Sequence, residues 1–134
     1  MTQTGPVAVV GAGIAGLAAA LSLARKGIAV DIVEQRSALM EVGAGLQLSP
    51  NATRILDRLG LTSRLEQVWS EPASINLIDG SSLRTIASVP SGRFARDRWK
   101  APYGVLHRAD LQKILLEAVE ANPLCRLHLG VRIE

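Results

Sequence analysis

Short apolar runs alternate with one helical segment near the start of the chain. Residues 7–10 are a continuous apolar run that stops at a glycine, a pattern typical of a parallel strand buried on both faces. Residues 14–26 are rich in alanine and leucine, which favour helix, and Gly27 can cap that helix. A second apolar run, interrupted only by Asp31, covers residues 28–33. The order strand, helix, strand predicts a right-handed crossover between two parallel strands.

The middle of the chain predicts two helices. Ser49 can be the N-cap of a helix that begins at Pro50, runs to about Leu59 and stops at Gly60. A short second helix is expected over residues 62–69.

A hairpin is expected after these helices. The segments 75–79 and 83–87 flank the turn sequence Gly-Ser-Ser and predict two antiparallel strands. Residues 88–102 show little periodicity and are expected to form a loop.

The last part of the chain predicts one more helix and one more strand. Residues 109–121 repeat apolar side chains on one helical face, and residues 124–129 predict a strand that continues weakly through Val131 and Ile133. Together the elements predict an α/β fold: a Rossmann-like βαβ unit with a parallel sheet and an added antiparallel hairpin.

Composition places the chain among globular proteins. Hydrophobic residues make up 48% and charged residues 20%, and the formal net charge is +3. Arg93, Arg96 and Arg98 cluster, which fits either a solvated surface or a phosphate patch. Aromatic residues are only 3% and form no stripe beside these arginines, so nucleic acid is not the favoured partner.

Cysteine usage and the absence of targeting signals favour a cytoplasmic protein. Cys125 is the only cysteine, so no intramolecular disulfide can form and no metal site is suggested. Its apolar neighbours indicate a strand residue rather than a reactive thiol. The amino terminus lacks the positive segment of a signal peptide, and no apolar run is long enough for a membrane span.

The sequence Gly11-Ala-Gly13-Ile-Ala-Gly16 joins the first strand to the first helix. In this context the first glycine allows a tight turn, the second lets the backbone approach a pyrophosphate, and the third lets helix and strand pack closely. The amides of Ile14 and Ala15 open the helix, where its dipole favours an anion. The alternative is that the glycines serve only backbone turns.

Glu34 ends the second strand, where an acid can accept hydrogen bonds from the adenosine ribose. A carboxylate there would repel a 2′-phosphate, which disfavours NADP. Arg36 is either an adenine or surface neighbour or a phosphate contact, and Gln35, between these two residues, is a further candidate for cofactor binding.

The segment after Glu34 favours FAD over NAD. Both cofactors share the ADP half, so the βαβ unit alone does not choose between them. An NAD domain would repeat strand and helix at once, whereas here a glycine-rich segment intervenes. Gly43 and Gly45 permit close approach of backbone to a flat ligand. The alternative is a simple loop before a helix.

Three stretches resemble one known family. They are Val9-Val-Gly-Ala-Gly-Ile-Ala-Gly-Leu, Gly43-Ala-Gly-Leu-Gln-Leu-Ser-Pro-Asn-Ala and Leu106-His-Arg-Ala-Asp-Leu-Gln. Together they resemble the start of the group A flavoprotein aromatic hydroxylases, the salicylate hydroxylase-like FAD monooxygenases. The resemblance implies that residues 1–134 are the N-terminal part of an FAD-binding domain, without its second half and without the substrate domain.

The resemblance also implies roles for individual residues. Gln47 would lie near the flavin, Arg108 would contact the ribityl or pyrophosphate part, and Val131 would supply backbone contacts near the adenine. Arg108 begins a helix, where a cation is unfavourable unless an anionic ligand lies nearby. The alternative is an exposed arginine.

The implied reaction is hydroxylation of a phenolic aromatic substrate with dioxygen, FAD and NADH or NADPH as external reductant. No catalytic residue is identified. A second Asp-Gly motif and a Gly-Asp motif of the family are absent, and Asp79-Gly80 falls in the predicted hairpin turn, so the chain is expected to be incomplete for catalysis. Two alternatives remain: another FAD-dependent oxidoreductase, or a catalytically silent nucleotide-binding module.

Overall fold

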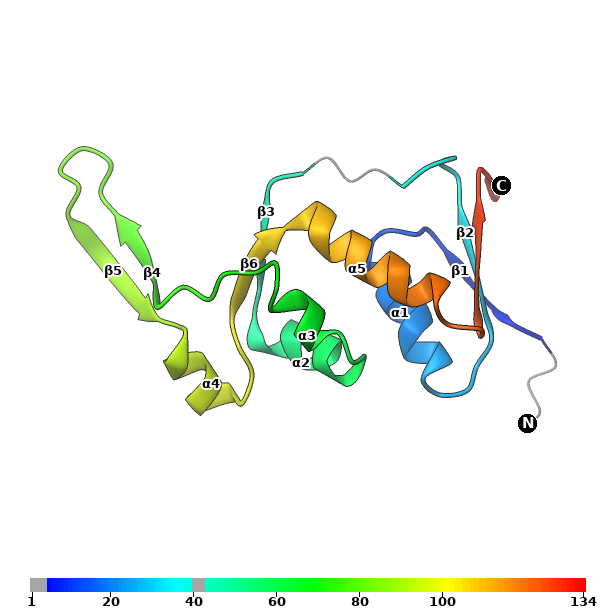
Figure 1. The fold of residues 1–134 in the computed structure, drawn as a ribbon. Helices are drawn as coiled ribbons and strands as arrows, with labels where there is room; N and C mark the ends of the chain where they lie inside the picture. The colour runs from blue at the N-terminus through cyan, green and yellow to red at the C-terminus, as the bar shows by residue number, and fades with distance from the viewer. Residues whose placement is uncertain (1–4, 40–42) are drawn as a thin grey trace. The chain divides into compact units, whose positions relative to one another are not determined.

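The computed structural model describes residues 5–39 and 43–134 (Figure 1). The chain consists of two compact units. The first unit comprises Met1–Ala44 and Arg108–Glu134, and the second comprises Gly45–His107. Each unit has its own strands and its own buried apolar side chains.

Three parallel strands form the sheet of the first unit. They are β1 (Val7–Val10), β2 (Val30–Glu34) and β7 (Cys125–Leu129), in the order β1-β2-β7. All pairings are parallel, with Val9 beside Ile32 on β2. The parallel sheet and the strand–helix–strand order confirm the predicted fold class. β2 ends at Glu34 as predicted, although it begins two residues later than the apolar run.

Two helices pack against each other in the first unit: α1 (Ile14–Ala24) and α5 (Arg108–Glu120). Leu17 and Ala20 of α1 are fully buried. The apolar face predicted for α5 is buried as well, at Leu111, Leu115 and Val119. Helix α1 ends before the predicted Lys26, and Gly27 makes the turn that follows, with a φ of 78°.

The final strand does not continue through Val131 and Ile133, so that expectation is wrong. Gly130 has a φ of 71°, which takes the chain out of the extended conformation. The Gly130 amide then donates to the Arg36 carbonyl (2.9 Å) and the Val131 amide to the Glu34 carbonyl (3.0 Å). These bonds hold the segment after β7 at the end of β2.

The second unit contains an antiparallel strand pair with two helices. Strands β3 (Gly45–Leu48) and β6 (Gly104–His107) pair antiparallel. Helices α2 (Pro50–Arg58) and α3 (Thr62–Leu65) come directly after β3 in the chain. Its buried apolar side chains include Leu48, Leu56, Leu61, Leu65 and Leu106. The start of α2 at Ser49 and Pro50 is confirmed, whereas α3 is shorter than the helix predicted over 62–69.

The predicted hairpin is present in the second unit. Strands β4 (Ser74–Ile78) and β5 (Thr85–Pro90) pair antiparallel, with an irregularity between Leu77 and Ile78. The Asp79 carboxylate accepts hydrogen bonds from the amides and hydroxyls of Ser81 and Ser82, which closes the turn. These four bonds hold the pKa of Asp79 well below its usual value.

The expectation of a loop over residues 88–102 is wrong, because this segment contains the end of β5 and helix α4 (Arg93–Trp99). The glycine-rich segment, for which a simple loop was the alternative, contains β3. Helix α4 is too short to show apolar periodicity, and contacts with residues distant in sequence support it: Ala95 is buried, and Arg96 donates a hydrogen bond to the Glu71 carboxylate (2.8 Å). Strand β3 contains two unfavourable features for a strand, glycine and a short length, and its pairing with β6 overrides them.

Candidate dinucleotide-binding site

The glycine motif forms the turn between β1 and α1. Gly11 has a φ of 97°, which other residues rarely adopt. A Cβ at Gly16 would lie 1.9 Å from the Gly11 carbonyl oxygen, so only glycine permits this contact between turn and helix. A Cβ at Gly13 would meet no heavy atom of the described residues within 4 Å. The first and third glycines therefore shape the turn, and the second leaves open space beside it.

The first turn of α1 is not capped by the described residues. Gly13 is the N-cap, no side chain hydrogen-bonds to the turn, and no acidic residue lies in it. The first amide bonded within the helix is that of Leu17, which donates to the Gly13 carbonyl (3.0 Å). The amides of Ile14 and Ala15 precede it, at the positive end of the helix dipole. Such amides are suited to an anionic group.

The Glu34 carboxylate lies at the same turn. It accepts a hydrogen bond from the Ala12 amide (2.9 Å) and another from the Arg36 amide (2.9 Å). These two bonds, with the nearby Arg36 charge, lower the pKa of Glu34 against a smaller opposing effect of burial. Glu34 is therefore ionised at neutral pH and can accept further hydrogen bonds from hydroxyl groups.

Two cavities open beside Glu34 in the first unit. One of about 220 Å³ is lined by Ala12, Gly13, Glu34, Gln35, Arg36, Leu39 and Gln112. The other, of about 310 Å³, is lined by Val10, Gly11, Val33, Glu34, Gln35, Val131, Arg132 and Ile133. The structure thus brings together the predicted residues Gly11, Gly13, Glu34, Gln35, Arg36 and Val131.

The sequence reasoning missed two residues of this site. Ala12 supplies the amide that meets Glu34, and Gln112 of α5 lines the smaller cavity. Gln112 is only 6% exposed, and its Nε2 lies 3.5 Å from the Ala12 carbonyl oxygen. A polar residue next to Leu111 on an otherwise apolar helix face is the signal that could have identified it.

The remaining predicted residues lie elsewhere. Gly45 and Gln47 belong to β3 in the second unit, where both are exposed and Gln47 pairs with Val105. Arg108 begins α5 in the first unit, and its Cδ would lie 3.3 Å from a Cβ at Gly43. Gly43 therefore allows the chain to pass close to this arginine.

Two other sequence features have clear structural environments. Arg96 forms an ion pair with the Glu71 carboxylate through its Nε and Nη2, and its Nη2 lies 3.8 Å from Glu66 Oε1. The charge of this member of the arginine cluster is therefore balanced by acidic side chains. Cys125 lies in β7 as predicted, and burial raises the pKa of its thiol. The described residues contain no group of His, Cys, Asp and Glu suited to a metal, and no helix among them could span a membrane.

Comparison with known proteins gives close relatives over nearly the whole chain. It is 39% identical over 127 residues to 3-hydroxybenzoate 6-hydroxylase 1 of Aquipseudomonas alcaligenes, covering 95% of this chain and 32% of that protein. It is 35% identical over 118 residues to 6-hydroxynicotinate 3-monooxygenase of Bordetella bronchiseptica, covering 88% and 31%. The chain thus spans about a third of the length of these relatives.

A solved structure shows the same fold. It is p-nitrophenol 4-monooxygenase PnpA from Pseudomonas putida DLL-E4, with a TM-score of 0.82 and 24% identity, over 93% of this chain and 31% of that one. Residues 4–134 match a family described as FAD binding domain.

Proposed function

The chain belongs to the FAD binding domain family, and from this premise we propose that the ADP half of FAD binds between its glycine motif and Glu34. The observation that supports this most directly is the Ala12–Glu34 hydrogen bond, which places an ionised carboxylate beside uncapped helix amides. A diphosphate needs such amides, and a ribose needs such an acceptor.

The residues present fit this cofactor. The space beside Gly13 admits a diphosphate that a larger side chain would exclude. The first-turn amides of Ile14 and Ala15, with that of Gly16, would donate to its oxygens, and Glu34 would accept from the ribose hydroxyls. Because Glu34 is ionised, a 2′-phosphate on the ribose would be repelled.

The cavity on the Val131 side suits the adenine. Its apolar surface comes from Val10, Val33 and Ile133. The backbone amide of Val131 donates to the Glu34 carbonyl, which places Val131 at the end of β2. Gln35 lines both cavities and Arg36 lines the smaller one, so each can contact the adenosine or a phosphate. We propose that the flavin end of FAD is contacted by Gly45, Gln47 and Arg108, because their segments resemble those of the family.

We further propose that residues 1–134 are the N-terminal part of the FAD-binding domain of an aromatic monooxygenase. The support is the relatives, which are named for hydroxylating 3-hydroxybenzoate and 6-hydroxynicotinate. Both substrates are small hydroxylated aromatic acids. When bound, FAD supplies the redox chemistry, with NADH or NADPH as reductant and dioxygen as oxidant. This chain's residues bind and orient it, and we place the reaction in the cytoplasm, where these reductants are held.

The first test is FAD binding by the chain carrying Gly13→Val. The backbone at Gly13 (φ −72°, ψ 178°) is extended, so valine fits the fold, but its side chain would fill the space proposed for the diphosphate. We expect the wild-type chain to show flavin absorbance and a saturable FAD titration, and the variant to lose FAD binding by at least tenfold.

Gly80→Val is the matched control, because a Cβ there also meets nothing within 4 Å among the described residues, and the turn lies in the second unit. This control should bind FAD like the wild type. Equal affinity of the Gly13 variant and the wild type, with both chains folded, would refute the assignment of the diphosphate site.

A further inference from the structure

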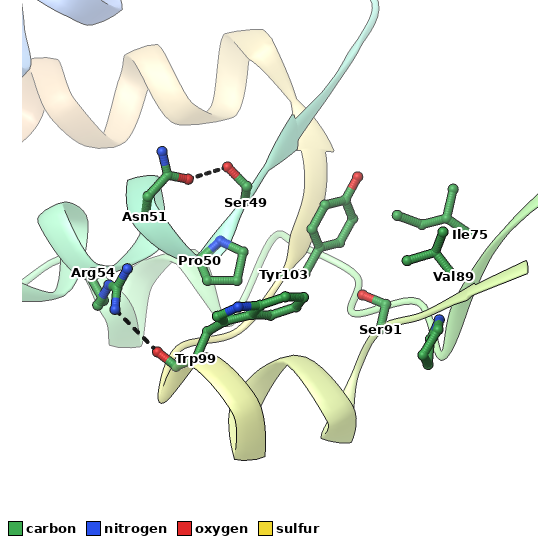
Figure 2. Close-up of a pocket in the computed structure, with 10 residues that line it drawn as sticks. Ser49, Pro50, Asn51, Arg54, Ile75, Val89, Ser91, Trp99 and Tyr103 are labelled. Carbon is green, nitrogen blue, oxygen red and sulfur yellow. Dashed lines mark hydrogen bonds between the residues drawn. The ribbon is translucent and has the colours of Figure 1, made fainter.

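Three polar side chains are buried among the described residues: Thr53, Ser91 and Gln112. In the second unit, Thr53 donates a hydrogen bond to the Pro102 carbonyl (2.7 Å), which joins two segments of that unit. Figure 2 shows Ser91 beside a cavity of the same unit, but its hydroxyl is fully enclosed and cannot reach a ligand there. Gln112 differs from both, because it lines the smaller cavity beside Glu34 in the first unit.

Gln112 lies on the buried side of α5. The neighbouring buried side chains of this helix include Leu111 and Leu115, and only 6% of Gln112 is exposed. An amide is costly to bury unless it is hydrogen-bonded, whereas an apolar side chain at this position would pack without that cost. The polar group of Gln112 therefore has a role other than packing.

The Gln112 side chain meets the glycine turn at the Ala12 carbonyl. Its Nε2 lies 3.5 Å from the carbonyl oxygen, at the long end of the range for a hydrogen bond. The nitrogen faces this oxygen, since the opposite orientation would bring two acceptors together. Among the described residues no backbone amide donates to the Ala12 carbonyl, because the first helical bond runs from the Leu17 amide to the Gly13 carbonyl. Gln112 is therefore the donor for this carbonyl.

The contact sets the orientation of the next amide. The Ala12 carbonyl and the Gly13 amide belong to one peptide plane, and none of the described peptide bonds is cis. In a planar trans peptide the C=O and N–H groups point in opposite directions. A carbonyl held towards Gln112 therefore turns the Gly13 amide away from α5.

The Gly13 amide is available to a ligand. It donates to no acceptor in the part of the chain that the structure describes. A Cβ at Gly13 would meet no heavy atom of the described residues within 4 Å, so a ligand atom can approach this part of the backbone. Gly13 also lines the smaller cavity, together with Gln112 and Glu34.

A glycine at this position makes an anchor for the plane valuable. Glycine tolerates both signs of φ, so the plane between Ala12 and Gly13 can rotate at little steric cost. A rotated plane would present its carbonyl oxygen to the cofactor, and this oxygen repels an anionic group. A plane that is fixed before binding avoids the cost of ordering it during binding.

Glu34 holds the other side of Ala12. Its carboxylate accepts a hydrogen bond from the Ala12 amide (2.9 Å), so the plane between Gly11 and Ala12 is fixed from the end of β2. The plane between Ala12 and Gly13 is fixed from α5. Two side chains that are far apart in sequence thus hold two successive planes of the turn.

We propose that Gln112 is a positioning residue of the dinucleotide site, whose hydrogen bond to the Ala12 carbonyl aims the Gly13 amide at the diphosphate. This inference rests on the FAD site proposed above and adds the Gly13 amide to its donors. Helix α5 lies outside the strand–helix–strand unit that carries the glycine motif, and through Gln112 it takes part in cofactor binding.

Isotope labelling makes the Gly13 amide directly observable. The sequence has three Ala-Gly pairs, at residues 12–13, 15–16 and 44–45. Alanine labelled with carbon-13 at the carbonyl and glycine labelled with nitrogen-15 give one cross-peak for each pair in a carbonyl–amide correlation spectrum. Gly13→Ala and Gly45→Ala each remove one cross-peak, which assigns all of them. In the wild type, ADP should shift the Gly13 amide proton downfield and leave Gly45, in the second unit, in place.

Gln112→Met removes the donor while keeping the side chain's length. In the ligand-free variant we expect the Gly13 cross-peak to move or split, while the Gly16 and Gly45 cross-peaks stay in place. FAD should bind about three- to fivefold more weakly, a modest loss because the hydrogen bond is long. Gln67→Met changes an exposed glutamine of the second unit; it is the matched control and should behave like the wild type.

The outcomes separate this inference from the proposed function. If the wild type binds FAD and Gln112→Met binds it equally well, the positioning role is refuted and the proposed function stands. If the wild type binds no FAD, both are refuted. Weaker binding with an unmoved Gly13 cross-peak also refutes positioning, because Gln112 would then contact the cofactor itself.

A wild-type measurement decides the case in which Gln112→Met does not fold. ADP should shift the Gly13 amide proton and leave the side-chain amide of Gln112 in place, since that group remains bonded to the Ala12 carbonyl. A Gly13 proton that does not respond to ADP, or a Gln112 side-chain amide that shifts as far as Gly13, overturns the proposal.

Discussion

Gly16 is the position of the glycine motif where a side chain would meet the backbone, at Gly11. A methyl group at Gly16 would lie 1.9 Å from a backbone oxygen that cannot rotate away. We expect Gly16→Ala to lower the free energy of unfolding by about 1–3 kcal/mol, the range for overpacked sites. Urea unfolding of the chain measures this. Gly13→Ala is the control, since its methyl group meets nothing, and similar losses in both variants would contradict the packing role.

The Glu34 carboxylate links stability to pH. Its folded pKa is lowered, so its stabilisation is present above the unfolded pKa and is lost as pH falls through the folded pKa. We expect the wild type to lose more stability than Glu34→Gln between about pH 6 and pH 3, as measured by thermal midpoints. Glu120→Gln, an exposed substitution on α5, should follow the wild type. Parallel curves for all three proteins would contradict the role of the two amide bonds.

At the level of single residues, the local spacing in the sequence was enough to predict part of the candidate site. Gly11, Gly13, Gly16 and Glu34 are fixed by a strand–turn–helix–strand unit whose geometry is set over a short stretch of chain. Gln112 could not be placed in the same way, because it reaches Ala12 only through the packing of α5 on α1.

At the level of elements, segments with a clear local pattern were predicted, including the short strand β1, whereas short segments with weak local signals were not. The face of α5 follows from apolar periodicity, and the turn of the hairpin follows from its glycine and serines. Strands β3 and β6 and helix α4 have weak local signals. Their conformations depend on pairing or side-chain contacts with residues distant in sequence, which no local pattern records.

Helix α5 makes a further prediction about the first unit. Leu115 is fully buried, so Leu115→Ala removes apolar contacts and leaves a cavity. We expect a loss of about 2–5 kcal/mol in the free energy of unfolding, measured with urea. Lys113→Ala, on the exposed side of the same helix, should change it by less than about 0.5 kcal/mol. Comparable effects in the two variants would argue against this packing.

At the scale of the whole molecule, we expect the proposed reaction to need more chain than these 134 residues. The relatives are about three times as long as the part they share with this chain. We expect these 134 residues to bind FAD without oxidising NADH in response to an aromatic acid. A protein of the relatives' full length, carrying this sequence, should oxidise NADH or NADPH faster when 3-hydroxybenzoate or a similar acid is added.

The measurement is nicotinamide absorbance with and without the acid, together with detection of the hydroxylated product. Oxidation that yields only hydrogen peroxide would instead favour an oxidase. Gly13→Val in the full-length protein is the control and should abolish the stimulated rate, since it blocks the proposed cofactor site.

The bond between the Ala12 amide and Glu34 has a kinetic consequence. This bond holds the glycine turn at the end of β2 without a ligand, so the turn already has its binding conformation before a dinucleotide arrives. Capture of a dinucleotide should then proceed in one bimolecular step, with a rate that rises linearly with concentration and shows no plateau from a slow loop rearrangement. Among variants that keep this bond, differences in affinity should appear mainly in the dissociation rate constant of the dinucleotide.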